Sequence, residues 1–294
     1  MKKIYLIITA LLITTAGVYS QKNRLVGSEW LQNRIPKGDL VIFHVGLEED
    51  YKKGHIDGAI LMEPSEYTYE DDVRVFDLPT DENLKELFES KGVSNETDVV
   101  IYTPTNWIPL VTRLYFTLDY LGHGDKTYIL NGGLVAWKAN GGNISTDAST
   151  VNKGLFNIKP NLSLLADQSN VLASIDNSKV NIVDCRAQVY YQGIEPTHGG
   201  RKGRVPGAKT IPYTSLYQKT DNGAYKFKSI DEIKEIFEGQ GLDKNKDLLL
   251  YCHIGMQLTV VYTAAQMLGF ENIKIYDGSF HEWGPDQSLP IEID

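Results

Sequence analysis

The segment DLLLYCHIGMQLTVVYTAAQMLGF, residues 247–270, carries the pattern that determines the fold. Its apolar run from Leu248 to Tyr251 lacks the alternation of a half-exposed antiparallel strand, which is typical of a buried strand in a parallel sheet. After Cys252 a turn, residues 253–257, leads into a helix predicted from Leu258 to Leu268. A second apolar strand follows at Ile273 to Tyr276. Strand, helix and strand in this order predict an α/β domain with a mainly parallel sheet.

The unit around this segment occurs twice in the chain. Residues 54–59 (GHIDGA) return as residues 203–208 (GRVPGA), and residues 98–103 (DVVIYT) return as residues 247–252 (DLLLYC), 149 positions later in both cases. A shared offset between separate matching segments indicates an internal duplication. The sequence therefore predicts two homologous domains in tandem.

Each copy carries the same local pattern. Short apolar runs at Leu40 to Phe43 and at Val180 to Val183 are typical of buried strands. Ser229 and Glu232 have the spacing of a capping box, which predicts the start of a helix in the second copy. The stretch between the copies is rich in Ser, Thr, Asn and Gly, as linkers are. We expect a first domain over residues 24–145, a linker over residues 146–164 and a second domain over residues 165–294.

Residues 1–20 (MKKIYLIITALLITTAGVYS) have the organisation of a bacterial secretory signal peptide, with two lysines, an apolar run and small residues at the end. Val18 and Ser20 fit the −3 and −1 positions of a cleavage site before Gln21. We therefore expect a periplasmic or secreted protein. The alternative is an uncleaved membrane anchor, although a spanning helix needs about 20 apolar residues.

The composition is that of an acidic globular protein. The 294 residues are 42% hydrophobic and 23% charged, and the formal charge is −9. Without the two signal-peptide lysines, 27 basic residues stand against 38 acidic ones, which gives −11. An acidic chain without a dense basic run is a poor partner for nucleic acid or for an anionic membrane surface. We expect no nucleic-acid partner and no stable membrane insertion after signal cleavage.

Cys252 is the candidate nucleophile. It lies where an apolar strand ends and a turn containing Gly255 leads into a helix. Ligands of open α/β sheets gather at the carboxyl ends of strands, and N–H groups at a helix start attract negative charge. We therefore expect a thiolate at Cys252, with a pKa below the usual value of about 8.5. The alternative is a structural cysteine buried as a small apolar residue.

Five segments in order resemble the rhodanese family of sulfurtransferases in its tandem form. The resemblance covers residues 25–290, and several of its elements recur in the first half. A Cys-x-x-Gly loop alone would be weak evidence, whereas five elements in order are specific. The matching segments are residues 183–186 (VDCR), 203–208 (GRVPGA), 252–255 (CHIG), 268–270 (LGF) and 277–283 (DGSFHEW).

The resemblance implies two mainly parallel sheets flanked by helices, and a reaction through a persulfide. The Cys252 thiolate takes a sulfane sulfur from a small anion, thiosulfate or 3-mercaptopyruvate, and passes it to a thiol or to cyanide. Backbone N–H groups of the loop hold the anionic sulfur. No metal and no organic cofactor is implied. The loop residues expected to bind substrate are His253, Ile254, Gly255, Met256 and Gln257.

The first domain is expected to be non-catalytic. Thr103 stands where the second copy has Cys252, and the following loop, residues 104–110, is two residues longer. Residues 44–46 (HVG) replace residues 184–186 (DCR), so the arginine is absent too. We expect this domain to pack against the second one and to form one wall of the cleft.

Basic residues near the second turn are candidates for binding the anion. Nine more residues separate Asp184 from Gly207 than separate the matching positions of the first copy. Arg186 and Arg204 carry fork-shaped donors suited to a carboxylate or sulfonate, and we predict that they bind the donor. The insertion also contains His198, Arg201 and Lys202, of which at least one is expected to be a solvated loop charge.

The two residues after Cys252 do not decide which sulfur donor the protein uses. Thiosulfate sulfurtransferases typically carry two basic residues there and mercaptopyruvate enzymes carry Gly-Ser, whereas this chain has His253 and Ile254. His253 is either an acid–base group with a pKa near neutrality or a side chain that points to solvent. Cys185 is expected to be a free, packed cysteine, and the alternative is a disulfide with Cys252.

Two other functions remain as alternatives. One is a sulfur carrier that is loaded once at Cys252 and does not turn over. The other is a phosphatase or arsenate reductase of similar fold, whose cysteine loop ends in arginine. Gln257 and Leu258 occupy the candidate positions for that arginine, which makes this alternative the weaker one.

Overall fold

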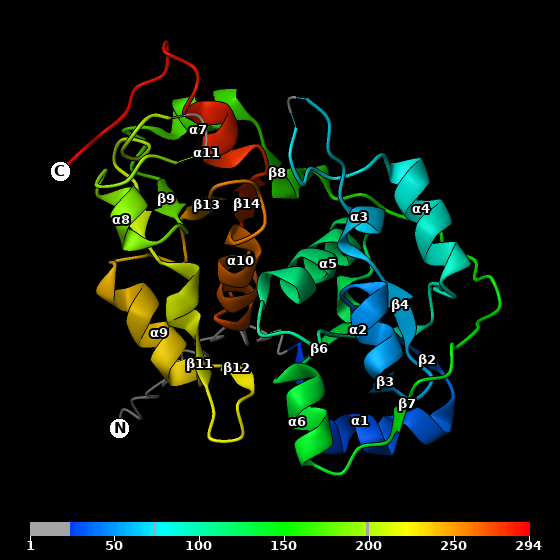
Figure 1. Ribbon diagram of the computed structural model, residues 1–294. Coiled ribbons are helices and arrows are strands. Elements are labelled where there is room, and N and C mark those ends of the chain that lie inside the picture. The colour runs from blue at the N-terminus through cyan, green and yellow to red at the C-terminus, as the bar shows by residue number, and fades with distance from the viewer. Residues whose placement is uncertain (1–23, 73, 198–199) are drawn as a thin grey trace, which may run out of the picture.

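The computed structural model describes residues 24–72, 74–197 and 200–294, so the predicted signal peptide lies outside the described residues. The chain forms two lobes, each built around a five-stranded sheet (Figure 1). Neighbouring strands are parallel throughout both sheets. Within the described ranges, none of the helices combines the length and the apolarity that crossing a membrane requires.

The first sheet has the strand order β1-β6-β5-β2-β4. Its central strand β5 is buried on both faces after its first residue, which explains the unbroken apolar run in the sequence. The elements of this lobe are β1 (Leu25–Val26), α1 (Ser28–Arg34), β2 (Leu40–Val45), α2 (Glu48–Lys53), β3 (His55–Ile56), β4 (Ile60–Met62), α3 (Pro64–Tyr67), α4 (Asp81–Ser90), β5 (Asp98–Tyr102), α5 (Pro109–Tyr120), β6 (Thr127–Leu130), α6 (Gly133–Ala139) and β7 (Ile144–Ser145).

The second sheet, β10-β9-β13-β14-β8, repeats this order from the opposite edge, with β13 in the place of β5. The matching topology agrees with the duplication in the sequence. The elements of this lobe are β8 (Leu165–Ala166), α7 (Gln168–Ser174), β9 (Val180–Asp184), α8 (Gln188–Tyr191), β10 (Lys209–Thr210), β11 (Tyr217–Lys219), β12 (Tyr225–Phe227), α9 (Ile230–Gly239), β13 (Asp247–Tyr251), α10 (Leu258–Met267), β14 (Ile273–Tyr276) and α11 (Ser279–Trp283).

The elements predicted around Cys252 are confirmed. The strand expected at Ile273 to Tyr276 is β14, and the helix expected from Leu258 is α10, which ends one residue before the predicted Leu268. Gly269 follows with a φ of +81°, the left-handed conformation of a C-terminal cap. Ser229 and Glu232 form the predicted capping box at α9.

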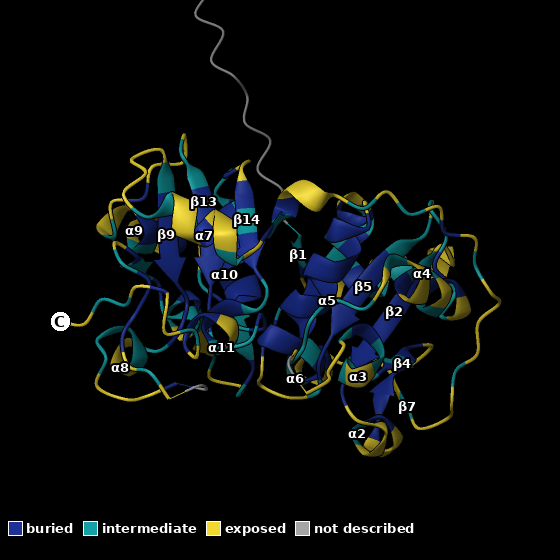
Figure 2. Cartoon of the chain, turned by 90° about the horizontal axis from the view of Figure 1, so that it is seen from above, coloured by how far each residue is buried: buried dark blue, intermediate teal, exposed yellow. Residues whose placement is uncertain are grey.

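One apolar core joins the lobes. Helices α5 and α10 pack against each other between the two sheets, where Figure 2 shows both of them buried. The hydroxyls of Thr112 and Thr259 are 2.8 Å apart across this helix pair. The outer face of each sheet carries a separate, smaller core around Trp137 and Trp283. The interface between the lobes is therefore part of the main core.

The stretch predicted as a linker packs on the first lobe. Phe156 is 1% exposed and meets Phe88 and His123 edge-on, with ring centroids 6.2 and 5.2 Å away. The N–H of Gly154 donates to the Glu89 carbonyl over 2.8 Å. This stretch therefore completes the hydrophobic core of the first lobe.

Each lobe extends a segment onto the other lobe, and the segment contacts the residue that follows β6 or β14 there. The N–H of Phe227 in β12 donates to Asn131 Oδ1 of the first lobe over 3.0 Å. The N–H of Leu78 donates to Asp277 Oδ2 of the second lobe over 3.2 Å. Phe227 follows Leu78 by 149 positions and Asp277 follows Asn131 by 146, so the two contacts are counterparts in the duplication.

Candidate active site

The end of β13 directs Cys252 toward the interface between the lobes. Leu248, Leu250 and Cys252 belong to the core between the sheets, whereas Leu249 and Tyr251 belong to the outer core. Side chains of a strand alternate between its two faces, so the residue after the strand continues the inward series. Cys252 is 0% exposed and lies at the carboxyl edge of the sheet, as the sequence predicted.

Backbone donors converge on the Cys252 sulfur. The N–H groups of Leu258, Ile254 and Gln257 hydrogen-bond to it and lower the pKa of the thiol. Burial has the larger effect, and the pKa is raised above its usual value. The expectation of a lowered pKa is therefore wrong for this closed site. The predicted ring of N–H donors is present, and such donors stabilise an anionic sulfur.

Ser279 hydrogen-bonds the backbone of the cysteine loop. Its hydroxyl accepts the N–H of Cys252 over 3.1 Å and the N–H of Gly255 over 3.3 Å, and it donates to the Tyr276 carbonyl over 2.8 Å. Its φ is +52°, which is unfavourable for a residue with a side chain. Backbone strain at a fully buried serine indicates a local constraint that the surrounding structure imposes.

Gly255 is the one loop position where only glycine fits. Its φ is +77°, and a Cβ there would lie 2.2 Å from Asp277 Oδ1. The backbone of the loop therefore packs directly on the Asp277 carboxylate. The side chain of Met256, the next residue, is fully buried in the core, whereas Ile254 is half-buried against it.

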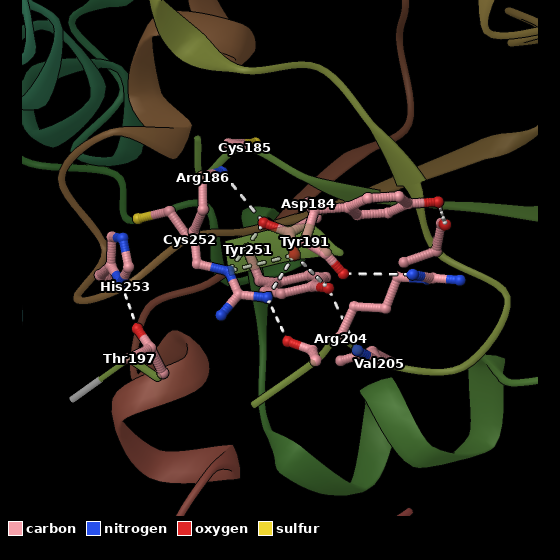
Figure 3. Close-up of polar contacts among 12 residues, drawn as sticks. Asp184, Cys185, Arg186, Tyr191, Thr197, Arg204, Val205, Tyr251, Cys252 and His253 are labelled. Atoms are coloured by element: carbon pink, nitrogen blue, oxygen red, sulfur yellow. Dashed lines mark hydrogen bonds and ion pairs between the residues drawn. The ribbon is translucent and has the colours of Figure 1, made fainter. Parts of the chain in front are cut away.

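Arg186 is enclosed within the protein. Its guanidinium and N–H groups bond both carboxylate oxygens of Asp184, and Nη2 donates to the Gly203 carbonyl over 2.7 Å (Figure 3). The charge also stacks on Phe280, 4.0 Å from the ring centroid. Arg186 is 0% exposed and does not line the cavity at the site. This placement gives Arg186 a bracing role. Its buried Nη1 has no hydrogen-bond partner among the described residues, so the contact with the donor stays a prediction.

Arg204 is also buried among protein partners. Its guanidinium pairs with Glu292 and, over 2.8 Å, with Asp294, and it stacks 4.3 Å from the centre of the Tyr191 ring. These contacts anchor the C-terminal segment rather than a ligand of Cys252. The prediction that Arg204 faces the donor therefore disagrees with the structure.

The cations of the insertion also have other partners. Arg201 donates to the carbonyls of Asp286 and Leu289, and Lys202 donates to the Ile194 carbonyl over 2.9 Å. The predicted candidate His198 lies outside the described residues. Arg201 and Lys202 therefore bond backbone carbonyls and do not line the cavity.

A cavity of about 560 Å³ opens beside the cysteine loop. Its lining includes Tyr190, Thr197, Tyr213, His253 and Gln257. His253 Nδ1 is hydrogen-bonded to the Thr197 hydroxyl, and the ring of Tyr190 meets the imidazole edge-on at 4.5 Å. The His253 imidazole therefore borders the cavity, and its acid–base role stays a prediction. The residues described as lining it all come from the second lobe, so the first does not form the expected wall.

Cys185 is a free thiol, as expected. It is 0% exposed, it shares the core between the lobes with Cys252, and its pKa is raised by burial and by that second cysteine. No disulfide joins the two residues.

The sequence profile of the rhodanese-like domain matches residues 28–140 and again residues 167–286. The chain belongs to the rhodanese family. Both domains therefore have the predicted fold, and the tandem arrangement is confirmed.

Two sulfurtransferases and a sulfur carrier protein match nearly the whole chain. A 3-mercaptopyruvate sulfurtransferase of Escherichia coli is 27% identical over 279 residues, covering 91% of this chain and 97% of that protein. The sulfur carrier protein TtuD of Thermus thermophilus is 31% identical over 290 residues, covering 93% and 98%. A putative thiosulfate sulfurtransferase of Saccharopolyspora erythraea is also 31% identical, over 289 residues, covering 93% and 97%.

Solved structures show the same rhodanese architecture. The 3-mercaptopyruvate sulfurtransferase SseA of Escherichia coli superposes with a TM-score of 0.77 at 25% identity, covering 87% of this chain and 98% of that one. Wild-type EanB superposes with a TM-score of 0.78 at 25% identity, covering 93% of this chain and 70% of that one. Together with the named relatives, these matches support rhodanese-type sulfur transfer.

Sequence reasoning missed several residues at this rhodanese site. Ser279 was visible only as part of the Asp-Gly-Ser turn, which gave no hint of its left-handed backbone. Tyr190 and Tyr213 line the cavity, yet no pattern distinguishes them among 17 tyrosines. Arg113, which bonds the Gly255 carbonyl, lies in the domain without the cysteine, where no functional residue was expected.

Proposed function

We propose that this protein is a sulfurtransferase that carries a sulfane sulfur as a persulfide on Cys252. The observation that carries the proposal is the set of three backbone N–H groups that converge on a buried cysteine sulfur at the carboxyl edge of a parallel sheet. The named sulfurtransferase relatives cover more than nine-tenths of the chain and support the same activity.

In the first half-reaction, the Cys252 thiolate attacks the outer sulfur of thiosulfate. A bond forms between the two sulfurs, and the electron pair of the old S–S bond leaves with sulfite. In the second half-reaction, a thiol or cyanide attacks the outer sulfur of the persulfide and regenerates the Cys252 thiolate. Cyanide becomes thiocyanate in this step. The loop N–H groups hold negative charge on sulfur in both halves.

Thiosulfate is the donor that we favour. A 3-mercaptopyruvate carboxylate is best held by an arginine fork. Arg186 and Arg204 direct their guanidinium groups at protein carboxylates, and no lysine or arginine lines the described part of the cavity. The hydroxyl, amide and imidazole groups around the cavity suit the distributed oxygens of a sulfonate. We also propose that residues 1–20 direct export to the periplasm or out of the cell.

The test is thiocyanate formation by protein that lacks residues 1–20. With cyanide as acceptor, we expect turnover with thiosulfate, a smaller rate with 3-mercaptopyruvate, and no activity in Cys252→Ser. Cys185→Ser is the matched control, because it removes the other buried thiol and should remain active. Intact mass after thiosulfate alone should increase by one sulfur atom in the wild type and in Cys185→Ser. Full activity in Cys252→Ser would refute the mechanism.

A sulfur carrier is the second candidate, because the carrier TtuD is 31% identical over nearly the full length. Steady-state kinetics separates the two functions. A carrier takes up one sulfur per chain and then stops in the presence of cyanide, whereas an enzyme forms thiocyanate in large molar excess over protein.

A further inference from the structure

Arg113 of the first domain reaches the cysteine loop of the second. It projects from α5 and is 0% exposed. Its Nη1 donates to the Gly255 carbonyl over 3.1 Å, and its two terminal nitrogens bond both oxygens of the Asp277 carboxylate. Nη2 also donates to the Phe76 carbonyl over 2.7 Å. One buried guanidinium therefore links the first domain to the loop that follows Cys252.

These contacts fix the peptide groups on both sides of Gly255. Ser279 accepts its N–H, Arg113 donates to its carbonyl, and the Asp277 carboxylate lies where a Cβ would be. Gly255 stands between Ile254 and Gln257, whose N–H groups point at the Cys252 sulfur. A rotation at Gly255 would turn these donors away from the sulfur. The conformation of the donor ring therefore depends on Arg113 and Asp277.

The counterpart site in the first domain has no such link. Asn131 stands at the place of Asp277, and Val260 stands at the place of the arginine, because the paired helices match at an offset of 147, as Thr112 and Thr259 do. Val260 is 0% exposed and has no polar side-chain group with which to bond Asn131. Both domains bind the Leu78 or Phe227 N–H at this place, but only the domain with the cysteine has the ion pair. The charged link therefore accompanies the cysteine rather than the fold.

We propose that Arg113 is a positioning residue for the reaction at Cys252, supplied by the domain that lacks a nucleophile. The inference rests on the proposed function of Cys252. Arg113 acts through Gly255 and Asp277 and does not touch the donor. On this view the first domain is retained because the loop of the second domain is complete only when the two are joined. Pairing with Asp277 is also what makes the buried charge of Arg113 tolerable.

The experiment compares Arg113→Lys with two controls on the same interface. Arg113→Lys keeps the charge but cannot bond Gly255, Asp277 and Phe76 together. Thr112→Val removes the hydrogen bond to Thr259, and Tyr115→Phe removes the bond to Gln266; both partners lie in α10 and outside the loop. A double variant, Arg113→Met with Asp277→Asn, removes both charges, so that no unpaired buried ion remains if the lysine variant folds poorly.

Two readouts are needed for each variant. In steady-state thiocyanate formation, we expect kcat to fall about 10- to 100-fold in Arg113→Lys and in the double variant, with KM changed less than about twofold. The second readout is the pH midpoint of Cys252 alkylation by iodoacetamide, followed by peptide mass in a Cys185→Ser background. It should rise by about one unit when the N–H donors turn away, and it needs no sulfur donor.

The controls should keep kcat and the alkylation midpoint of the wild type even where their thermal midpoints fall. If the Arg113 variants also keep both values and differ only in thermal stability, Arg113 is merely structural and the inference is overturned. Alkylation does not depend on sulfur transfer. If the wild type shows no turnover but the alkylation midpoint rises in the Arg113 variants, the positioning role is supported and the proposed function is refuted. An unshifted midpoint with normal turnover does the reverse.

Discussion

The two domains build the same hydrogen-bonded centre from different residues. In the second, the Tyr251 hydroxyl donates to Asp184 over 2.8 Å and accepts the Val205 N–H over 3.1 Å. In the first, the Tyr102 hydroxyl lies 2.9 Å from His44 Nδ1 and accepts the Ile56 N–H over 2.8 Å. The tyrosine and its backbone partner are kept, and the charged residue is not.

The residues that stack beside this centre also differ in charge between the two domains. Arg204 stacks on Tyr191 in the second domain, whereas His55 stacks on Tyr51 in the first, with ring centroids 3.6 Å apart. Burial lowers the pKa of His44 to about 4, so the His44 imidazole is uncharged at neutral pH. The fold therefore needs the hydrogen bonds of this centre, and only the domain with Cys252 combines them with buried charge.

A transplanted nucleophile should expose this difference most strongly. In a protein with Cys252→Ser, the change Thr103→Cys places a thiol at the matching strand end. We expect no thiocyanate above background, because Gly133 replaces Ser279 and offers no hydroxyl. The longer loop expected from the sequence is not found, because residues 104–108 and residues 253–257 are loops of equal length between strand end and helix. The measurement is turnover with thiosulfate and cyanide, beside the Cys252→Ser parent. Activity within tenfold of the wild type would show that the cysteine alone separates the domains.

Ser279 offers the next largest effect, because its counterpart Gly133 shares the left-handed backbone, with φ of +54° against +52°. Both Ser279→Gly and Ser279→Ala lose the hydroxyl that holds the N–H groups of Cys252 and Gly255. We expect kcat to fall about tenfold or more in both. The free energy of unfolding should be higher in Ser279→Gly than in Ser279→Ala by roughly 1 kcal/mol, because glycine adopts this φ without strain. Equal kcat in the wild type and Ser279→Gly would contradict a role for the hydroxyl.

The bracing arginines come third, because they affect stability before catalysis. Arg186→Ala leaves Asp184 buried without its partner, and we expect a loss of about 3–5 kcal/mol in the free energy of unfolding. Arg204→Ala should cost clearly less, since Glu292 and Asp294 are partly exposed. Urea unfolding of both variants checks the order. A raised KM for thiosulfate in Arg186→Ala, with unfolding unchanged, would restore the role that the sequence suggested.

Sequence reasoning located the elements well because their signals are local. The apolar run of β13, the spacing within α10 and the repeat offset of 149 all lie in the printed order of residues. The position of Cys252 followed from these signals alone. The N–H donors of Ile254 and Gln257 could be expected for the same reason, since they belong to the turn itself.

Arg204 and Arg113 could not be placed in this way, because their partners are distant in sequence. Arg204 meets Glu292, 88 positions away, and Arg113 meets Asp277, 164 positions away. A charge near a site in sequence is attracted by whichever carboxylate the fold brings closest. The lowered pKa expected at Cys252 failed for a related reason, since the helix start was visible in the sequence and the depth of burial was not.

Asp77 gives the smallest expected effect and tests the contact between the first domain and the Asp277 turn. Its pKa is raised to about 6, first by burial and then by the negative charge of Asp277, while Arg113 and Arg74 lower it and Glu282 raises it. A raised pKa in the folded state adds stability that is fully present below about pH 4 and is lost as the pH rises through about 6. Asp77→Asn should therefore be more stable than the wild type at pH 7.5, by about 1–2 kcal/mol for a half-buried group. The difference should shrink toward pH 4, where the wild-type carboxyl is protonated, and comparing unfolding midpoints of the two proteins across pH 4–8 measures it. A difference that is independent of pH would mean that the Asp77 charge is not repelled by Asp277.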